Sequence, residues 1–208
     1  VLDCVASRAL WIDMVALGVD VLLSAPQKGW SATPCAGLVM LSERGLARVA
    51  ETESSSYVCD VKKWLGIMQA YENGGHAYHA TMPTDSLLVF RDTLIETKNY
   101  GFEAVRQEQI DIGTAVRSLL ESRGFLSVAA DGFKAQSVVV SFTDDDDIKN
   151  GSKFAAAGLQ IAAGVTLQGG EGPDFKSFRI GLFGLDKLHN TSRSVKNFEK
   201  ALDQVLAS

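Results

Sequence analysis

The 208-residue sequence lacks any apolar run close to the roughly 20 residues that a helix needs to cross a bilayer. It also lacks a basic stretch, because 20 Lys and Arg stand against 25 Asp and Glu and give a net charge of −5. A net-acidic chain without a basic stretch is poorly suited to bind nucleic acid or an anionic membrane. We therefore expect no nucleic acid and no membrane among its partners.

Cysteine is scarce as well. Cys4, Cys35 and Cys59 are an odd, scattered set, and no two of them form a CxxC pair. Such a set fits a reducing compartment better than a framework of disulfides. We therefore expect a cytoplasmic protein.

No residue cluster has the spacing of a metal site. His76 and His79 lie three apart with Cys59 upstream, which fits no structural zinc pattern. The four aspartates at 144–147 lack the glycine and the bidentate glutamate of a calcium loop. Acidic residues at the start of a helix, where they complement the helix dipole, explain that run better. We therefore predict no metal.

The composition is that of an ordinary globular protein, with 46% apolar and 22% charged residues. Strands are predicted over 1–5, 19–24 and 36–41. Since a long crossover separates the first two, parallel pairing is favoured over a hairpin. The first hundred residues are therefore predicted to form part of a parallel α/β sheet, and the last hundred a smaller α+β domain. Helices are predicted from residue 42, over 61–71, 84–97, 102–123, 144–158 and 192–206, and further strands over 125–130, 138–142, 159–165 and 178–183.

Two charged residues lie where the predicted sheet would bind a ligand. Lys28 follows the strand 19–24, and Asp3 lies near the carboxyl end of the strand 1–5. Ligands of open α/β sheets bind outside the carboxyl ends of strands, so one crevice would hold both side chains. Position alone leaves a second interpretation open, in which Lys28 is an exposed loop residue and Asp3 caps a turn.

Five segments in the same order resemble the class V aminotransferases, which use pyridoxal phosphate (PLP), and in particular the alanine–glyoxylate and serine–glyoxylate or serine–pyruvate members. The segments are 1–7 (VLDCVAS), 18–29 (GVDVLLSAPQKG), 36–38 (AGL), 77–83 (AYHATMP) and 178–184 (FRIGLFG). The resemblance covers essentially the whole chain and corresponds to the C-terminal half, or slightly more, of a family member. Because Val1 stands directly in a predicted strand, we expect an N-terminal part to precede it.

The resemblance implies an α/β fold-type-I PLP-dependent transferase. Residues 1–100 would be the C-terminal part of the PLP-binding large domain, whose sheet is mostly parallel, and residues 101–208 the small C-terminal α+β domain. The implied reaction is a transamination from a small amino acid, alanine or serine, to a small 2-oxo acid, glyoxylate or pyruvate.

The resemblance also assigns the cofactor contacts. Lys28 would be the Schiff-base lysine and proton shuttle, because a deprotonated amine is both a nucleophile and a base. Asp3 would pair with the pyridine nitrogen and keep it protonated. Val5, on the same face of the strand, would pack under the ring. Gln27 would donate to the cofactor phosphate.

Three further residues match family positions. Tyr78 and Thr81 would reach across a homodimer interface to the phosphate in the partner's site. Arg179 would bind the substrate carboxylate through two parallel hydrogen bonds. The resemblance thus implies a homodimer with shared sites. Without it, Arg179 would be a rim arginine in a salt bridge, and Tyr78 and Thr81 ordinary loop hydroxyls.

Two other functions stay open. The chain could be another class V PLP enzyme, of the lyase or desulfurase type, although a desulfurase needs a catalytic cysteine in the C-terminal third and the last one here is Cys59. It could also be an inactive fragment that acts only as a folded or assembling module. The segment 33–37 (TPCAG) departs from the Pro-Pro-Gly of many members, which makes the substrate less certain than the cofactor. Trp30 either walls the site or packs in the interior.

Overall fold

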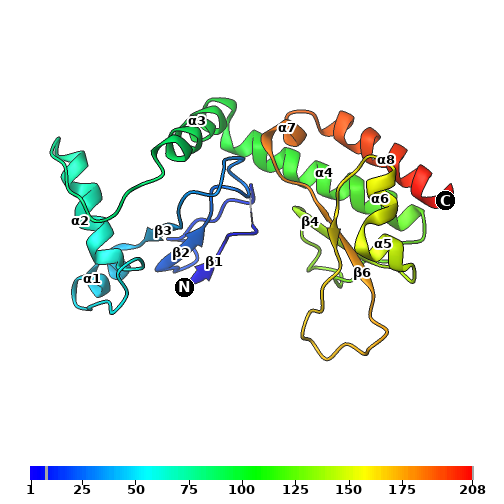
Figure 1. The fold of residues 1–208 in the computed structure, drawn as a ribbon, viewed down its shortest axis with the longest axis horizontal. Coiled ribbons are helices and arrows are strands. Elements are labelled where there is room, and N and C mark those ends of the chain that lie inside the picture. The colour runs from blue at the N-terminus through cyan, green and yellow to red at the C-terminus, as the bar shows by residue number, and fades with distance from the viewer. Residues whose placement is uncertain (8, 208) are drawn as a thin grey trace.

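A computed structural model describes residues 1–7 and 9–207. The described chain contains two small sheets, each of three strands, which lie in different parts of the molecule (Figure 1). The first sheet has the order β1-β2-β3 and the second the order β4-β6-β5. Their strands are β1 (Leu2–Asp3), β2 (Val21–Ser24), β3 (Leu38–Leu41), β4 (Val138–Phe142), β5 (Ala162–Ala163) and β6 (Ser177–Gly181).

The first sheet carries Asp3 at the end of β1, and Lys28 follows β2. β1 and β2 are parallel, with Asp3 opposite Leu23, so the pairing predicted for these two strands is confirmed. β3 is antiparallel to β2, with Leu22 opposite Met40, and is an exception to the parallel sheet predicted for this region. The connection from β2 to β3 holds a turn and a loop but no helix, and an antiparallel neighbour needs no helical crossover.

The first four helices lie close to their predicted positions. They are α1 (Glu43–Ala50), α2 (Val61–Glu72), α3 (Thr84–Tyr100) and α4 (Phe102–Ser122). The Ser42 side chain accepts a hydrogen bond from the Gly45 N–H, which confirms the predicted start of α1. Gly101, with φ 108°, separates α3 from α4. The first half of the chain thus follows its local signals.

The second half departs further from prediction. Its helices are α5 (Asp146–Asn150), α6 (Ser152–Ala156), α7 (Leu185–Leu188) and α8 (Thr191–Ala207). Asp145 caps α5 with its carboxylate, so the aspartate run is confirmed as a helix start. Gly151, with φ 86°, splits the helix predicted over 144–158 into α5 and α6. No prediction covered the short α7.

One strand prediction in this half is wrong and another is confirmed only in part. Residues 125–130 form no strand, although Ser127 bridges Ser141 and two backbone hydrogen bonds join the segment to β4. The strand predicted over 159–165 is reduced to the two residues of β5, which pair with β6.

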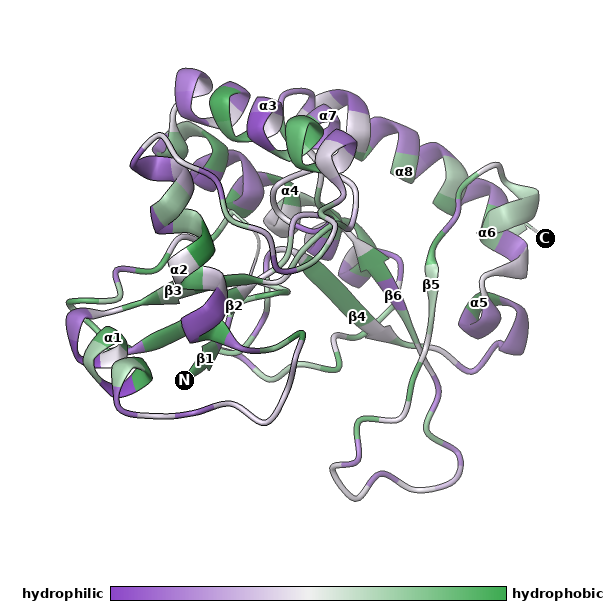
Figure 2. Cartoon of the chain, turned by 60° about the vertical axis from the view of Figure 1, so that its left-hand side comes forward, coloured by the Kyte–Doolittle hydropathy of each residue, from purple (hydrophilic) through white to green (hydrophobic). Residues whose placement is uncertain are grey.

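The main core lies between α4, α8 and the second sheet. Val105, Ile112 and Leu120 line the buried face of α4, opposite Leu202 on α8 and Phe178 on β6. Figure 2 shows β4 in largely hydrophobic colours where it faces this core. In contrast, α2 has no buried residue. No helix within the described part of the chain is both long and apolar enough to cross a membrane.

Candidate active site at the Lys28 loop

Lys28 lies in a tight turn that begins directly after β2. The Ala32 N–H donates to the Pro26 carbonyl at 3.1 Å, and the Ser31 N–H donates to the Lys28 carbonyl at 3.3 Å. Ser31 adopts φ 57°, a left-handed conformation that is unusual for a residue other than glycine. The backbone around Lys28 is therefore held in one conformation by its own hydrogen bonds.

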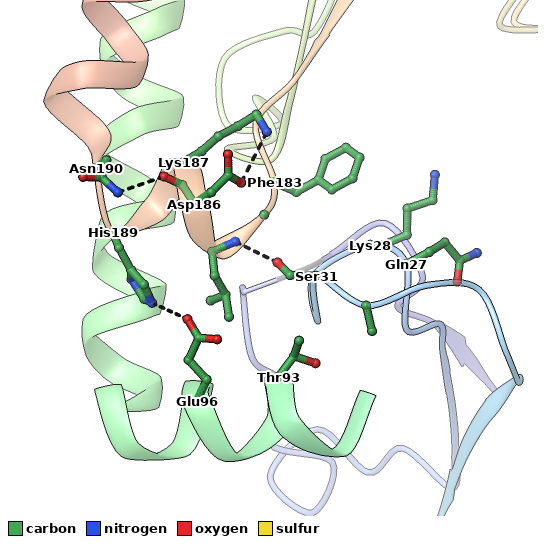
Figure 3. Close-up of a pocket in the computed structure, with 13 residues that line it drawn as sticks. Gln27, Lys28, Ser31, Thr93, Glu96, Phe183, Asp186, Lys187, His189 and Asn190 are labelled. Carbon is green, nitrogen blue, oxygen red and sulfur yellow. Dashed lines mark hydrogen bonds and ion pairs between the residues drawn. The ribbon is translucent and has the colours of Figure 1, made fainter. Parts of the chain in front are cut away.

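Lys28 and Gln27 line a pocket of about 520 Å³ (Figure 3). The Lys28 side chain is half-buried, and its Nζ lies 5.8 Å from the centroid of the Phe183 ring. Within residues 1–7 and 9–207, no carboxylate forms an ion pair with this amine. The remaining lining residues are Ser31, Ala32, Thr93, Glu96, Phe183, Gly184, Leu185, Asp186, Lys187, His189 and Asn190.

The far wall of the pocket holds a polar cluster around His189. Its Nδ1 lies 3.4 Å from a Glu108 oxygen and its Nε2 lies 3.6 Å from a Glu96 oxygen. The Tyr100 ring lies against the imidazole, with 3.8 Å between ring centroids and a tilt of 32° between ring planes, and its hydroxyl donates to Glu108 at 2.5 Å. The hydrogen bond to Glu108 raises the pKa of Tyr100. No local pattern predicts this cluster, since its members come from α3, α4 and the end of α7.

Asp3 pairs with Leu23 of β2, and neither Asp3 nor Val5 lines the pocket that holds Lys28. Asp3 is exposed, and its carboxylate accepts a hydrogen bond from the Val5 N–H at 2.9 Å. β1 ends at Asp3, so the expectation that Val5 lies on the strand is wrong, and Val5 stands in the following turn. No basic side chain of the described residues forms an ion pair with Asp3.

Arg179 lies on β6, between β4 and β5. It is half-buried, and its Nε donates to the Ala163 carbonyl at 2.8 Å. In the described chain no carboxylate pairs with it, so the salt-bridged rim arginine considered from the sequence is not found. This contact fixes one side of the guanidinium. Arg179 does not line the Lys28 pocket.

Tyr78 and Thr81 lie in the segment that joins α2 to α3 (Figure 1), and neither lines the pocket. Their hydroxyls are 3.2 Å apart, and Tyr78 is 77% exposed. Tyr78 therefore lies next to Thr81, and Gln27 next to Lys28 in the pocket. Within one chain the first pair does not reach the pocket that holds the second pair. Their role toward a second subunit remains a prediction.

Trp30 has a packing role. Its ring lies 5.0 Å from Trp11 and 6.2 Å from Phe90, measured between centroids, and it does not line the pocket. The Trp11 indole N–H donates to the Phe102 carbonyl at 2.8 Å. This aromatic cluster attaches the Lys28 loop to the junction of α3 and α4. All three cysteines are free thiols, and no group of three or more potential metal ligands occurs among the residues described.

Solved structures identify the class of fold. The chain superposes with a TM-score of 0.78 on alanine–glyoxylate aminotransferase from Nostoc sp., at 21% identity, over 98% of this chain and 52% of that one. It also superposes on ureidoglycine–glyoxylate aminotransferase from Bacillus subtilis, with a TM-score of 0.76, 19% identity, and coverage of 99% and 51%. The chain has the fold of the C-terminal part of a fold-type-I aminotransferase, as predicted.

Curated proteins narrow the resemblance. The chain is 25% identical to alanine–glyoxylate aminotransferase of Felis catus over 193 residues, and 26% identical to that of Callithrix jacchus over 194 residues. These alignments cover 90% and 91% of this chain and 45% of each relative, so the chain spans less than half the length of the relatives it matches. No family model matches the sequence. The chain resembles the C-terminal part of alanine–glyoxylate aminotransferases.

Proposed function

We propose that this chain is the C-terminal part of a PLP-dependent aminotransferase that moves an amino group from alanine or serine to glyoxylate or pyruvate. One observation carries the proposal. Asp3 ends β1, Lys28 stands in the turn after the adjacent parallel strand β2, and neither side chain forms an ion pair with another described residue. An amine and an acid at the carboxyl ends of neighbouring parallel strands suit a cofactor that needs a nucleophile and an acidic partner.

Each residue has a task that its surroundings support. When bound, PLP supplies an electron sink for the charge that develops on the amino acid α-carbon. The Lys28 amine, which no described carboxylate holds, would attach the cofactor and carry a proton to and from that carbon. Asp3 would keep the ring nitrogen protonated, Gln27 would donate to the phosphate, and Val5 would pack against the ring.

Arg179 would bind the substrate carboxylate. Its Nε is already fixed by the Ala163 carbonyl, so the guanidinium plane is oriented before substrate arrives. A planar fork makes two parallel, charge-assisted hydrogen bonds to a carboxylate, which lysine cannot do. Alanine and serine differ by one hydroxyl, which a small pocket discriminates by only about 1–3 kcal/mol.

The first test asks whether Lys28 is the attachment site. The chain is incubated with PLP, reduced with borohydride, and the modified peptide is identified by mass spectrometry. We expect one dominant adduct on Lys28, lost in Lys28→Ala. Lys149→Ala is the matched control, because Lys149 is also half-buried and has no carboxylate partner among the described residues. An adduct spread over surface lysines would overturn the proposal and favour the inert, assembling module.

The second test concerns the reaction and the second subunit. Alanine and serine are offered as donors with glyoxylate and pyruvate as acceptors, and product is measured for the chain alone and with the N-terminal part of the protein supplied. We expect transamination. If elimination of sulfur or water is the main reaction instead, the lyase or desulfurase alternative is favoured.

The oligomeric state is tested by sedimentation. The exposed hydroxyls of Tyr78 and Thr81 are available to a second subunit, and we expect a homodimer.

A further inference from the structure

We propose that Ser31 is a positioning residue that joins the Lys28 turn to the segment carrying Arg179. The inference rests on the proposed function, because it names what holds the amine and the arginine in one frame. The Ser31 hydroxyl accepts a hydrogen bond from the Leu185 N–H at 2.7 Å, across 154 residues of sequence. Figure 3 shows this bond spanning the pocket wall between the Lys28 loop and the start of α7.

On the Lys28 side, Ser31 is bound to the residue it would position. Its N–H donates to the Lys28 carbonyl, and the next N–H, of Ala32, closes the turn onto Pro26. The left-handed φ of 57° directs the backbone so that these bonds and the hydroxyl contact occur together. An unfavourable conformation persists only where the surroundings hold it, and here three hydrogen bonds do so.

On the Arg179 side, the contact falls where the chain is rigid. Leu185 is buried and is the first residue of α7, whose initial N–H groups have no partner within the helix. Arg179 lies on β6 just before this point, and the Leu182 N–H between them donates to the Ser137 carbonyl at 2.9 Å. We therefore expect a displacement of Leu185 to be transmitted along this short segment to β6 and Arg179.

Gly184 precedes Leu185 in a conformation that favours glycine. It adopts φ 112°, and a Cβ added there would meet the Asp186 carboxylate at 2.8 Å, whereas its 3.9 Å separation from the Ser31 hydroxyl is an ordinary contact. The Phe183 ring, one residue earlier, lies beside the Lys28 amine. The turn and the segment 183–185 thus meet at two adjacent points.

Three substitutions separate the hydroxyl from the backbone strain. Ser31→Ala removes the acceptor and keeps the strain, whereas Ser31→Gly removes both. Ser31→Asn keeps an acceptor oxygen on a residue type that tolerates a left-handed φ. Gln168→Gly is the matched control, since Gln168 has the same φ of 57° in the loop between β5 and β6 and does not line the pocket. Far-ultraviolet circular dichroism confirms that each variant is folded.

The first readout is hydrogen exchange at the Leu185 amide and in the peptide that contains Lys28. We expect exchange at both to quicken about three- to tenfold in the Ala and Gly variants, the range expected for one lost hydrogen bond, and to return near wild type in Asn. Gln168→Gly should leave both unchanged. If the Leu185 amide of Ser31→Gly exchanges at the same rate as in the wild type, the proposal is overturned. This measurement needs no cofactor.

The second readout is the PLP concentration that half-saturates the borohydride-trapped adduct on Lys28. We expect it to rise about three- to tenfold in Ala and Gly and to recover in Asn. Unchanged half-saturation in Ser31→Gly would also overturn the positioning role. If wild type itself forms no Lys28 adduct, the proposed function fails, while the exchange result still decides whether Ser31 joins the two segments.

Discussion

Single buried side chains hold the second sheet to the helices, and Phe178 is the clearest case. Its side chain is wholly buried, with ring centroids 5.2 Å from Phe125 and 5.8 Å from Phe154. Phe178→Ala leaves a cavity that neighbouring rings can fill only in part. We expect the free energy of unfolding to fall by about 3–5 kcal/mol, measured by urea denaturation.

Phe133→Ala removes the same group from the surface. Phe133 is 82% exposed, so its loss should change the free energy of unfolding by less than about 0.5 kcal/mol. Similar losses for the two variants would contradict the placement of Phe178 in the core.

The site residues show what is predictable at this scale. Strand signals alone predicted that Asp3 and Lys28 follow neighbouring parallel strands, and the register of β1 and β2 confirms that pairing. Val5 was misplaced, because the Asp3 carboxylate accepts a hydrogen bond from the Val5 N–H and caps a turn there, which was the second interpretation of Asp3. The contact of Ser31 with Leu185 could not be foreseen, since no local pattern links residues so far apart.

At the scale of elements, two helical glycines should respond in opposite ways. A Cβ at Gly113 in α4 would lie 2.4 Å from the Gln136 carbonyl oxygen, whereas a Cβ at Gly66 in α2 meets nothing within 4 Å. Gly113→Ala should destabilise the protein by about 1–3 kcal/mol through overpacking. Gly66→Ala should stabilise it by about 0.5–1 kcal/mol through reduced freedom of the unfolded chain.

Thermal melts followed by circular dichroism at 222 nm measure both changes in one series. Equal shifts in the same direction would mean that α4 does not approach Gln136 as closely as the structure shows.

Helices were predicted better than strands, for a physical reason. A helix closes its hydrogen bonds within a few residues, so the cap Ser42 locates α1 and the apolar spacing over 61–71 locates α2. A strand needs a partner, and the apolar run 125–130 finds only one bridge beside β4. Gly151 is a sequence signal for the break between α5 and α6, because glycine weakens a helix interior.

For the whole molecule, acid stability depends in part on how the first sheet is fastened to α1. The Asp20 carboxylate accepts hydrogen bonds from Arg44 and from Ser42, and these lower its pKa below the ordinary value of 3.8. The unfolded chain then binds the proton at higher pH than the folded one. The stabilisation is present above about pH 4 and is lost as the pH falls through the folded-state pKa.

Asp20→Asn should therefore lower the urea midpoint at neutral pH and flatten its decline between about pH 4 and about pH 2. Asp174→Asn is the control, because Asp174 is exposed and has no ion pair among the residues that the structure describes. If Asp20→Asn and wild type lose stability in parallel on acidification, the proposed role of the Arg44 pair is wrong.

Local signals are enough to predict most of the helices, the parallel pairing of the first two strands and the likeness to the C-terminal part of class V aminotransferases, in which Lys28 and Asp3 follow neighbouring strands. These follow from short-range hydrogen bonding, apolar spacing and ordered motifs. The residues that wall the pocket, the packing of Trp30 against Trp11 and the contact of Ser31 with Leu185 appear only in the folded chain. Those contacts join segments distant in sequence, and their geometry is fixed only when the core between α4, α8 and β6 has closed.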